Sequence, residues 1–358
     1  MVFEKILFSS VILILLLIAG CTQPEKNEIK ESGIAKIVKN IPAETSGTTP
    51  TSAPNPKSST LRGFSLSPKS YEGKDFTGFF EKVAKTQNLE RGTVISWAGD
   101  WNELGNEKGG PAVVMELAKQ YNYVPLVEAQ FFTQSTGKLL RPLDTETKQK
   151  YKESAVSFAK KYKPEYLAIG IEINILYEKS PEDFDNFVEF YPEVYTAIKE
   201  VSPNTKVFKI FQLEKMKGLN GGLFGGENNQ ANAQWQLLEK FKKSDIIAFT
   251  TYPGLIYADH SEIPVDYYSE IKAHTQKPIA FTETGWHSAA SPKDWESSEE
   301  EQAEFVKIFF SRTNKLESEF VIWSFLYDQK TIEPFNSMGM YGADGSEKAS
   351  WKEWLDAK

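Results

Sequence analysis

The sequence predicts an α/β fold, a (β/α)8 barrel of the TIM type, in a single folded domain. After residue 60, short β-branched or aromatic runs alternate with longer amphipathic stretches, as in repeated βα units around a parallel sheet. Eight such runs occur, and the 298 residues from 61 to 358 match a barrel of about 250 residues with insertions. An open doubly wound sheet is the second interpretation. It loses support because no G-x-G-x-x-G follows the first strand.

The expected strands are the short β-branched or aromatic runs. They are Leu61–Leu66, Gly92–Trp97, Tyr123–Ala129, Tyr166–Ile173, Lys206–Gln212, Ile246–Tyr252, Pro278–Glu283 and Phe320–Phe325. The expected helices carry apolar residues at helical spacing. They are Phe76–Thr86, Gly110–Tyr121, Thr145–Tyr162, Asp183–Val201, Asn229–Lys243, Val265–His274 and Ser298–Leu316. The glycine-rich stretch Gly218–Gly226 lacks the ending of a phosphate loop, so we expect a mobile loop there.

The first residues have the pattern of an export signal. Lys5 precedes an apolar run from Ile6 to Ala19, which is short for a membrane span and typical of a signal-peptide core. The run meets Leu17–Cys21, which resembles the lipobox of secreted lipoproteins. We therefore expect residues 1–20 to be a lipoprotein signal peptide and Cys21 to be the lipid attachment site. An uncleaved membrane anchor is the alternative. Both place the rest of the chain outside the cytoplasm, at the cell surface or on the periplasmic side.

Residues 21–60 are rich in Ser, Thr, Pro, Lys and Glu. Such a composition buries too little apolar surface to offset the entropy of ordering, so the segment is predicted to be a disordered tether. The folded domain then comprises residues 61–358. Oligomeric state has no sequence signal, and we expect a monomer.

Charge and cysteine content exclude several classes of protein. The net charge of −8 argues against a nucleic-acid partner. Cys21 is the single cysteine, so neither a disulfide framework nor a cysteine zinc site can form. The three histidines lack metal-ligand spacing, so we expect no metal and no cofactor.

Two glutamates end expected strands of the barrel. Glu172 ends the fourth strand and Glu283 the seventh, which are the ends where barrel active sites lie. By the two-residue period of a strand, Gly170, Glu172 and Asn174 are expected to share one face. Either glutamate alone could be a surface residue. Together they are the pair that glycoside hydrolysis needs, one carboxyl protonated and one ionised.

These strand ends resemble those of clan A glycoside hydrolases, retaining (β/α)8 enzymes. Gly170–Asn174 is similar to the acid/base segment of arabinogalactan endo-β-1,4-galactanases, and Thr282–Trp286 to the nucleophile segment of those enzymes and of β-1,3-glucanases. The resemblance implies that Glu172 is the acid/base and Glu283 the nucleophile. It also implies that Tyr252 bonds the nucleophile and that Trp323 forms the floor of the central sugar subsite.

One position departs from the clan pattern. The residue before the acid/base is usually Asn, which binds the sugar 2-hydroxyl, whereas this chain has Ile171. Asn174 could replace that contact. The loss favours an alternative function, a catalytically weak or inactive carbohydrate-binding surface lipoprotein on the same barrel. A cell-envelope scaffold without sugar affinity is a third possibility.

Other polar and aromatic residues follow the expected strands. Indole rings stack on sugar faces and carboxyl or amide groups fix hydroxyls. The expected substrate-binding set therefore comprises Tyr252, Trp323, Trp286, Trp97, Asp100, Glu128 and Asn174, with Trp101, Gln130, Gln212, Glu214 and His287 nearby. The function predicted from the sequence is a retaining glycosidase acting on a β-linked oligo- or polysaccharide at the cell surface.

Overall fold

The computed structural model describes residues 60–84, 93–293 and 295–357 of the chain. The predicted signal peptide, Cys21 and almost all of the predicted tether lie outside the described residues. Within the described ranges, no helix combines the length and apolar character needed to span a membrane.

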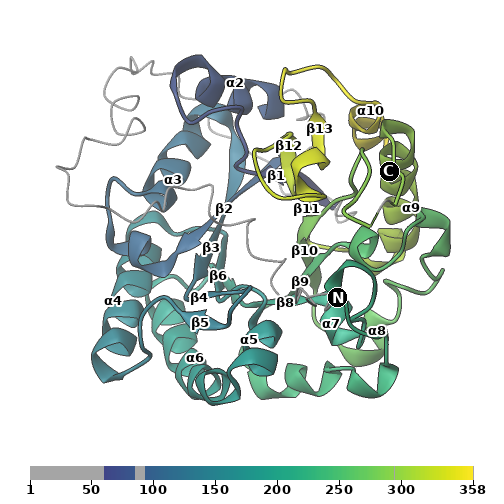
Figure 1. Cartoon of the computed structure of the whole chain (residues 1–358). Coiled ribbons are helices and arrows are strands. Elements are labelled where there is room, and N and C mark those ends of the chain that lie inside the picture. Colours follow the sequence, from purple (N-terminus) through teal and green to yellow (C-terminus); the bar gives the residue numbers. More distant parts are fainter. Residues whose placement is uncertain (1–59, 85–92, 294, 358) are drawn as a thin grey trace, which may run out of the picture.

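The described strands form one parallel barrel, seen end-on in Figure 1. Its members are β1 (Leu61–Ser65), β2 (Thr93–Asp100), β3 (Tyr123–Gln130), β6 (Tyr166–Ile169), β7 (Lys206–Phe208), β8 (Ile210–Gln212), β9 (Ile247–Thr251), β10 (Ile279–Thr284) and β11 (Phe320–Trp323). Their order is β7-β6-β3-β2-β1-β11-β10-β9-β8. The two ends of this order, β7 and β8, are halves of the fifth strand and are interrupted at Lys209. The sheet therefore closes on itself, and the predicted (β/α)8 fold is confirmed.

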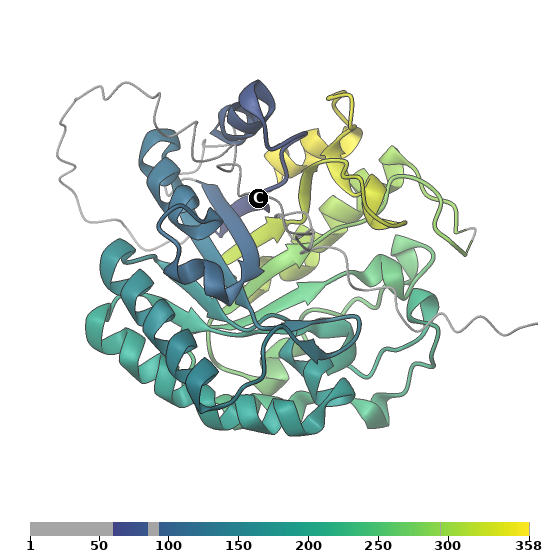
Figure 2. The ribbon, with the colours of Figure 1, turned by 60° about the vertical axis from the view of Figure 1, so that its left-hand side comes forward.

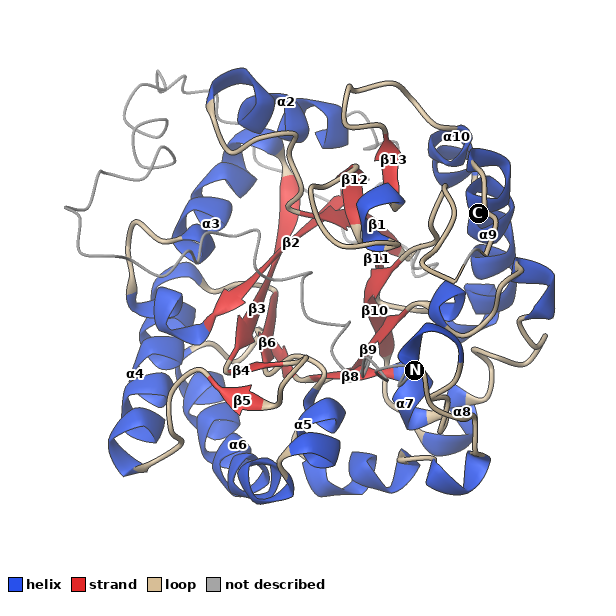
Figure 3. Ribbon diagram, viewed as in Figure 1, coloured by secondary structure: helices blue, strands red, loops and turns tan. Residues whose placement is uncertain are grey.

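Helices surround the barrel, as the secondary-structure colouring in Figure 3 shows. The longer ones are α2 (Gly73–Ala84), α3 (Gly110–Tyr121), α4 (Thr145–Tyr162), α6 (Pro181–Val201) and α9 (Glu299–Thr313). Shorter helices are α5 (Ile173–Lys179), α7 (Leu213–Met216), α8 (Ile271–His274) and α10 (Ala349–Asp356). The side view in Figure 2 places the long helices outside the strands, with the strands pointing in a common direction.

Helix ends follow local sequence signals. Asp144 accepts a hydrogen bond from the backbone of Thr147 at the start of α4, and Ser298 accepts one from Glu301 at the start of α9. At the end of α3, Asn122 adopts the left-handed conformation that terminates a helix. These signals explain why the predicted bounds of α3 and α4 are confirmed.

Two helix predictions were wrong in part. The stretch Asn229–Lys243 contains two 3-10 helices, Gln230–Asn232 and Trp235–Phe241, in place of one α-helix. The stretch Val265–His274 is α-helical only in α8. Val265 is 83% exposed, so the apolar residue at the start of the predicted helix does not pack in the core. The glycine-rich stretch after the fifth strand contains the 3-10 helix Gly222–Phe224.

Alternating residues of each strand face the barrel interior or the helices. Leu126 of β3 and Ala248 of β9 belong to the inner apolar cluster, whereas Val127 and Phe249 pack with the helices. Small sheets lie at the carboxyl ends of the strands. They pair β4 (Phe132–Thr133) with β5 (Lys138–Leu139) and β12 (Phe325–Tyr327) with β13 (Gly339–Tyr341). The inner face of the carboxyl ends is therefore where functional side chains can gather.

Candidate active site

A ring of polar side chains replaces the apolar core at the carboxyl ends of the strands. By alternation and by contact, each of the eight barrel strands, or the short segment that follows it, contributes one. They are Ser65, Ser96, Glu128, Glu172, Gln212, Thr250, Glu283 and Ser324. All but Ser65 are buried. Buried polar groups require hydrogen-bond partners, so the contacts of this ring indicate what it can do.

Glu172 reaches the ring through an irregular backbone. β6 ends at Ile169, and both Gly170 and Glu172 have positive φ, at 102° and 50°. Strand alternation is therefore lost: Ile171 packs in the inner apolar cluster, and α5 begins at Ile173. The expectation that Gly170, Glu172 and Asn174 share a strand face was wrong for this reason. A non-glycine residue in the left-handed region costs free energy, and such residues are frequent at active sites.

Glu283 reaches the same ring through an irregularity in β10. The register between β9 and β10 shifts between Phe281 and Glu283, so that Glu283 is the partner of Thr250. Phe281 packs with the helices and Thr250 bonds a carboxylate of the ring. Bulges of this kind redirect side chains beside active sites.

Thr250 connects the two glutamates. Its backbone is in register with Glu283, and its hydroxyl donates a hydrogen bond of 2.6 Å to Oε1 of Glu172. The amide of Gln212 approaches the same oxygen at 3.4 Å. Glu172 and Glu283 are only 6% and 7% exposed. Thr250 therefore links two nearly buried carboxyl groups that belong to segments far apart in sequence.

Tyr252 is bonded to Glu283. Its hydroxyl donates to Oε2 of Glu283 across 2.6 Å and lies 2.7 Å from the Ser324 hydroxyl. Ser324 in turn lies within hydrogen-bond distance of the Thr284 carbonyl. Burial and the neighbouring Glu283 raise the pKa of Tyr252 well above 10, so it remains a donor. The contact that the clan resemblance implied is present.

Burial raises the pKa of both carboxyl groups, and different neighbours act on each of them. Burial first, and then the charge of Glu283, raise the pKa of Glu172 to about 8, against the opposing donors Thr250 and Gln212. Burial raises the pKa of Glu283 to about 7, and the Tyr252 hydroxyl acts in the opposite direction. The charge of Glu283 therefore favours the protonated form of Glu172, and the Tyr252 hydroxyl favours the ionised form of Glu283.

Glu128 is a third carboxyl group of the ring. It is 0% exposed, and neither of its oxygens has a well-oriented hydrogen-bond partner among the described residues. Burial raises its pKa well above 4.5, and the charges of Glu283 and Glu172 act in the same direction, while the Ser96 hydroxyl opposes them. Its neighbours in register are Ala98 on β2 and Ala168 on β6, so only small side chains flank it.

Glu214 supports Tyr252 from behind. Its Oε1 accepts hydrogen bonds from the Thr251 hydroxyl, the Tyr252 backbone and the Tyr267 hydroxyl, at 2.8, 2.9 and 2.8 Å. It is fully buried, and burial raises its pKa. Glu214 therefore holds the segment that carries Tyr252.

Three tryptophans expected to stack on substrate are buried elsewhere. Trp97 and Trp323 lie on the outer faces of β2 and β11 and pack with the helices, because inner residues such as Ser96 and Ile322 alternate with them. The Trp323 indole donates to the Met338 carbonyl at 2.8 Å. Trp286 is wholly buried and stacks on Phe305. The structure offers no free face of these rings to a sugar.

Asn174 and Asp100 are occupied by protein partners. Asn174 is fully buried and exchanges two hydrogen bonds with the Gln212 backbone, which ties α5 to β8. It therefore does not replace the amide lost at Ile171. Asp100 lies at the rim and is held by Arg141 through two hydrogen bonds of 2.7 and 2.8 Å.

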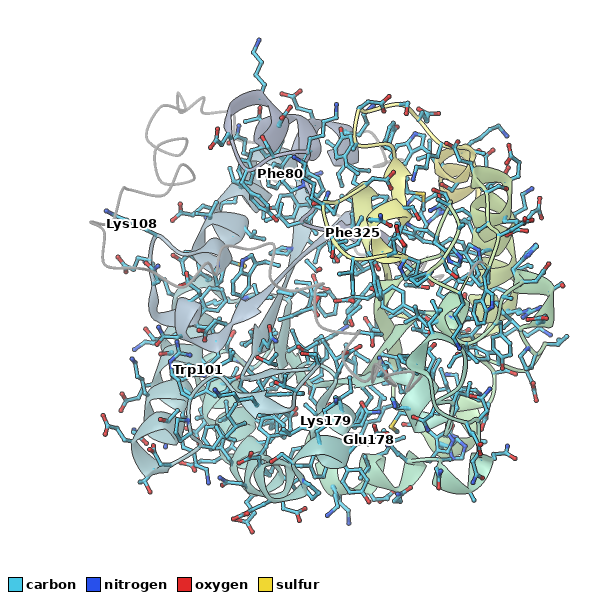
Figure 4. All side chains as sticks on the ribbon, in the orientation of Figure 1. Phe80, Trp101, Lys108, Glu178, Lys179 and Phe325 are labelled. Atoms are coloured by element: carbon cyan, nitrogen blue, oxygen red, sulfur yellow. The ribbon has the colours of Figure 1, made fainter. Side chains whose placement is uncertain are left out.

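The remaining nearby residues also have structural contacts. Trp101 stacks on Tyr151 of α4, and Figure 4 shows it towards the outside of the barrel. Gln130 donates to the Phe132 carbonyl and to Gln134. His287 is buried against Trp286, and burial lowers its pKa to about 4, so it is neutral.

Sequence reasoning missed Thr250, Ser324 and an apolar wall to which Tyr252 belongs. The period of two from Ala248 would have found Thr250. The wall comprises Tyr252, Leu255, Phe325, Phe335 and Met338. Figure 4 labels Phe325 near the centre of the end-on view. Among the described residues, no group of three or more acidic, histidine or cysteine side chains could hold a metal ion.

Comparison with known proteins supports the fold. No family model matches the chain, and no curated protein matches it. Solved structures do match. The GH53 catalytic domain of Ignisphaera aggregans is 13% identical, with a TM-score of 0.57 over 84% of this chain and 98% of that one. An exo-β-1,4-mannosidase from Opitutaceae bacterium strain TAV5 is 14% identical, with a TM-score of 0.56 over 83% of this chain and 58% of that one.

A family 39 glycoside hydrolase from Bacteroides cellulosilyticus WH2 gives the same identity and TM-score, over 83% of this chain and 62% of its own. The chain thus spans about three fifths of the last two structures. The described barrel has the fold of glycoside hydrolases.

Proposed function

We propose that the protein is a retaining glycosidase that acts on a β-linked oligo- or polysaccharide. The observation that carries the proposal is the buried pair Glu172 and Glu283, which Thr250 links: its hydroxyl bonds Glu172, and its backbone is in register with Glu283. A retaining glycosidase needs one protonated and one ionised carboxyl group flanking the scissile bond.

The environment of each group suits one role. In the first step an oxygen of Glu283 forms a bond to the anomeric carbon, the bond to the leaving oxygen breaks, and Glu172 gives that oxygen its proton. In the second step a water attacks the anomeric carbon, Glu172 takes the water proton, and the bond to Glu283 breaks. The configuration at the anomeric carbon is retained. Tyr252 stabilises Glu283 as an anion before attack and as a leaving group afterwards.

The choice of glycans to test as substrates rests on the sequence and structural similarities. The strand ends around Glu172 and Glu283 resemble those of arabinogalactan endo-β-1,4-galactanases and β-1,3-glucanases, and a GH53 domain and a β-1,4-mannosidase share the fold. These similarities support a panel of β-1,4-galactan, β-1,3-glucan and β-mannan as first substrates.

The test is the release of new reducing ends from this panel by the full-length protein. Glu283→Gln is expected to abolish release, whereas Glu81→Gln on the exposed surface of α2 is expected to leave it unchanged. Glu283→Ala with added azide and an activated aryl glycoside should yield a glycosyl azide, because azide can enter where the nucleophile was removed. Turnover that persists in Glu283→Gln would refute the assignment.

A second function, sugar binding without turnover, is favoured by one observation. Ile171 packs into the inner apolar cluster and Asn174 is saturated by protein partners, so neither supplies the amide that clan members direct at the 2-hydroxyl. Retention of a panel glycan on affinity electrophoresis, with no products after prolonged incubation, would support this function in place of hydrolysis.

We also propose an extracytoplasmic, membrane-anchored location through a lipid on Cys21. The support is the apolar run Ile6–Ala19 followed by the lipobox-like Leu17–Cys21. Cys21→Ala is expected to move the protein from the membrane to the soluble fraction and to prevent labelling with a fatty acid. Membrane association that survives this substitution would favour the uncleaved anchor.

A further inference from the structure

The polar ring contains acidic groups that lack a basic partner. Within the described residues, burial and hydroxyl, amide or backbone donors shift the pKa values of Glu128, Glu172, Glu283 and Glu214. Neighbouring carboxyl groups also raise the pKa of Glu128 and Glu172. No described lysine or arginine is among these groups. The nearby His287 is held neutral by burial, which lowers its pKa to about 4. Buried carboxyl groups normally pair with a cation or remain protonated.

Among these acidic groups, Glu128 is the one without well-oriented hydrogen-bond partners in the described part of the chain. Glu172 and Glu283 have the hydrogen-bond partners expected of catalytic groups, but both oxygens of Glu128 lack well-oriented ones among the described residues. The side chain is 0% exposed and shares the inner face of β3 with Leu126. A buried, unpartnered carboxyl group is costly unless another group satisfies it.

The position of Glu128 relates it to a bound sugar. Glu128 lies on the inner face of β3, beside β6, the strand that leads to Glu172, and the charges of Glu283 and Glu172 raise its pKa. Under the proposed function the anomeric carbon lies between Glu172 and Glu283. A positive charge beside that carbon would act on Glu128 with the opposite sign. The interaction does not require contact, because burial in the protein weakens the screening of charges relative to water.

We infer, on the basis of the proposed function, that the ring selects a β-linked sugar with a protonated amine at C2, the ring carbon next to the anomeric carbon, and that Glu128 is a specificity-determining residue for this amine. The position of Ile171 is consistent with this substrate class. The clan amide that binds a 2-hydroxyl is absent, because Ile171 is apolar and Asn174 is bonded to the Gln212 backbone. An ammonium group needs acceptors, and the unpartnered oxygens of this ring are acceptors.

The test uses three oligosaccharides of the same length and β-1,4 linkage that differ only at C2. They are the glucosamine, N-acetylglucosamine and glucose oligomers, and they carry an amine, an acetamide and a hydroxyl group. Their dissociation constants for the full-length protein are measured by calorimetry at about pH 6. The amine oligomer is expected to bind at least about ten-fold more tightly than the other two, the effect of one charge-assisted interaction.

Proton release provides a second measurement. A cation beside Glu128 favours its ionised form, so binding of the amine oligomer should release protons. The apparent enthalpy should then vary with the ionisation enthalpy of the buffer, more strongly than for the glucose oligomer. Glu128→Gln is expected to remove most of the ten-fold preference and to reduce the proton release, while affinity for the glucose oligomer is kept. Glu81→Gln is the matched control.

Equal or weaker binding of the amine oligomer by the wild-type protein would overturn the inference, and this measurement does not depend on the folding of any variant. An equal loss of affinity for all three oligomers in a folded Glu128→Gln variant would overturn the role of Glu128. Reducing ends released from neutral glycans with no preference for the amine would leave the proposed function intact and refute only the inference. A preference for the amine with no hydrolysis of any glycan would refute the proposed glycosidase alone.

Discussion

The Tyr252 hydroxyl donates a hydrogen bond of 2.6 Å to Oε2 of Glu283. Tyr252 directly follows β9 and Glu283 lies near the end of the neighbouring β10, and Glu214 fixes the Tyr252 backbone through an accepted bond of 2.9 Å. This donor favours the ionised form of Glu283 against the effect of burial. The acidity of the proposed nucleophile therefore depends on a tyrosine that directly follows the preceding strand, β9.

Tyr252→Phe is expected to raise the pKa of Glu283 above about 7. Because Glu283 must be ionised to attack, the acid limb of the pH profile of kcat/KM should move to higher pH. The maximum should fall by about 10- to 100-fold, since a hydrogen bond to a charged group contributes about 1.5–3 kcal/mol. Tyr195→Phe is the control, because its hydroxyl also donates to a carboxylate, Asp245, but before β9 begins. An unchanged acid limb in Tyr252→Phe would contradict the prediction.

Thr250→Val should move the opposite limb. The Thr250 hydroxyl favours the ionised form of Glu172, so its removal should raise the pKa of Glu172 above about 8. Glu172 acts as an acid while protonated, and the alkaline limb of kcat/KM should therefore shift to higher pH. Thr313→Val, which loses only a bond within α9, is expected to leave both limbs in place. A downward shift of the alkaline limb in Thr250→Val would show that Thr250 does not act on Glu172 in this way.

The same two carboxyl groups should destabilise the folded protein at alkaline pH. Their folded-state pKa values, about 8 and about 7, exceed the ordinary value of 4.5. The folded state therefore binds more protons than the unfolded state between about pH 4.5 and pH 8, and stability falls as pH rises through this range. Glu172→Gln and Glu283→Gln are each expected to raise the free energy of unfolding at pH 8 by about 2–4 kcal/mol.

Urea titrations at pH 5 and pH 8 check this expectation. At pH 5 the wild-type protein and the glutamine variants should differ little, because the carboxyl groups are then protonated in the folded state. Variants that are less stable than the wild type at pH 8 would contradict it.

Lys209 is a buried base in the fifth strand of the barrel. It interrupts the fifth strand between β7 and β8, is 0% exposed, and lies over the rings of Tyr191, Phe211 and Phe241. Burial lowers its pKa well below 10.5, so the unfolded state binds the proton more tightly. Stability should accordingly increase with pH up to about 10.5. Lys209→Met is expected to raise the free energy of unfolding at pH 7 by about 1–3 kcal/mol and to reduce this increase. Lower stability of the variant would show that the aromatic contacts outweigh desolvation.

The strands could be predicted from the sequence because a parallel barrel buries both faces of each strand. Runs such as Leu167–Ile169 and Ile279–Phe281 are apolar throughout, and the first charged residue after each lies near its carboxyl end. This local signal placed Glu172 and Glu283 at the correct end of the barrel. The alternation of inner and outer positions along a strand could also have placed Trp97 and Trp323. Because Ser96 and Ile322 face the interior, the adjacent tryptophans face the helices.

Only the tertiary structure shows how the residues of the site come together. Glu172 turns inward because Gly170 and Glu172 adopt positive φ, and Glu283 because β10 shifts register after Phe281. Neither irregularity follows the regular period of two on which pattern reasoning depends. The contacts of Thr250 with Glu172 and of Tyr252 with Glu283, and the isolation of Glu128, arise only when strands distant in the chain close into a barrel. Local residue order sets where strands end, whereas packing between strands sets which side chains meet there.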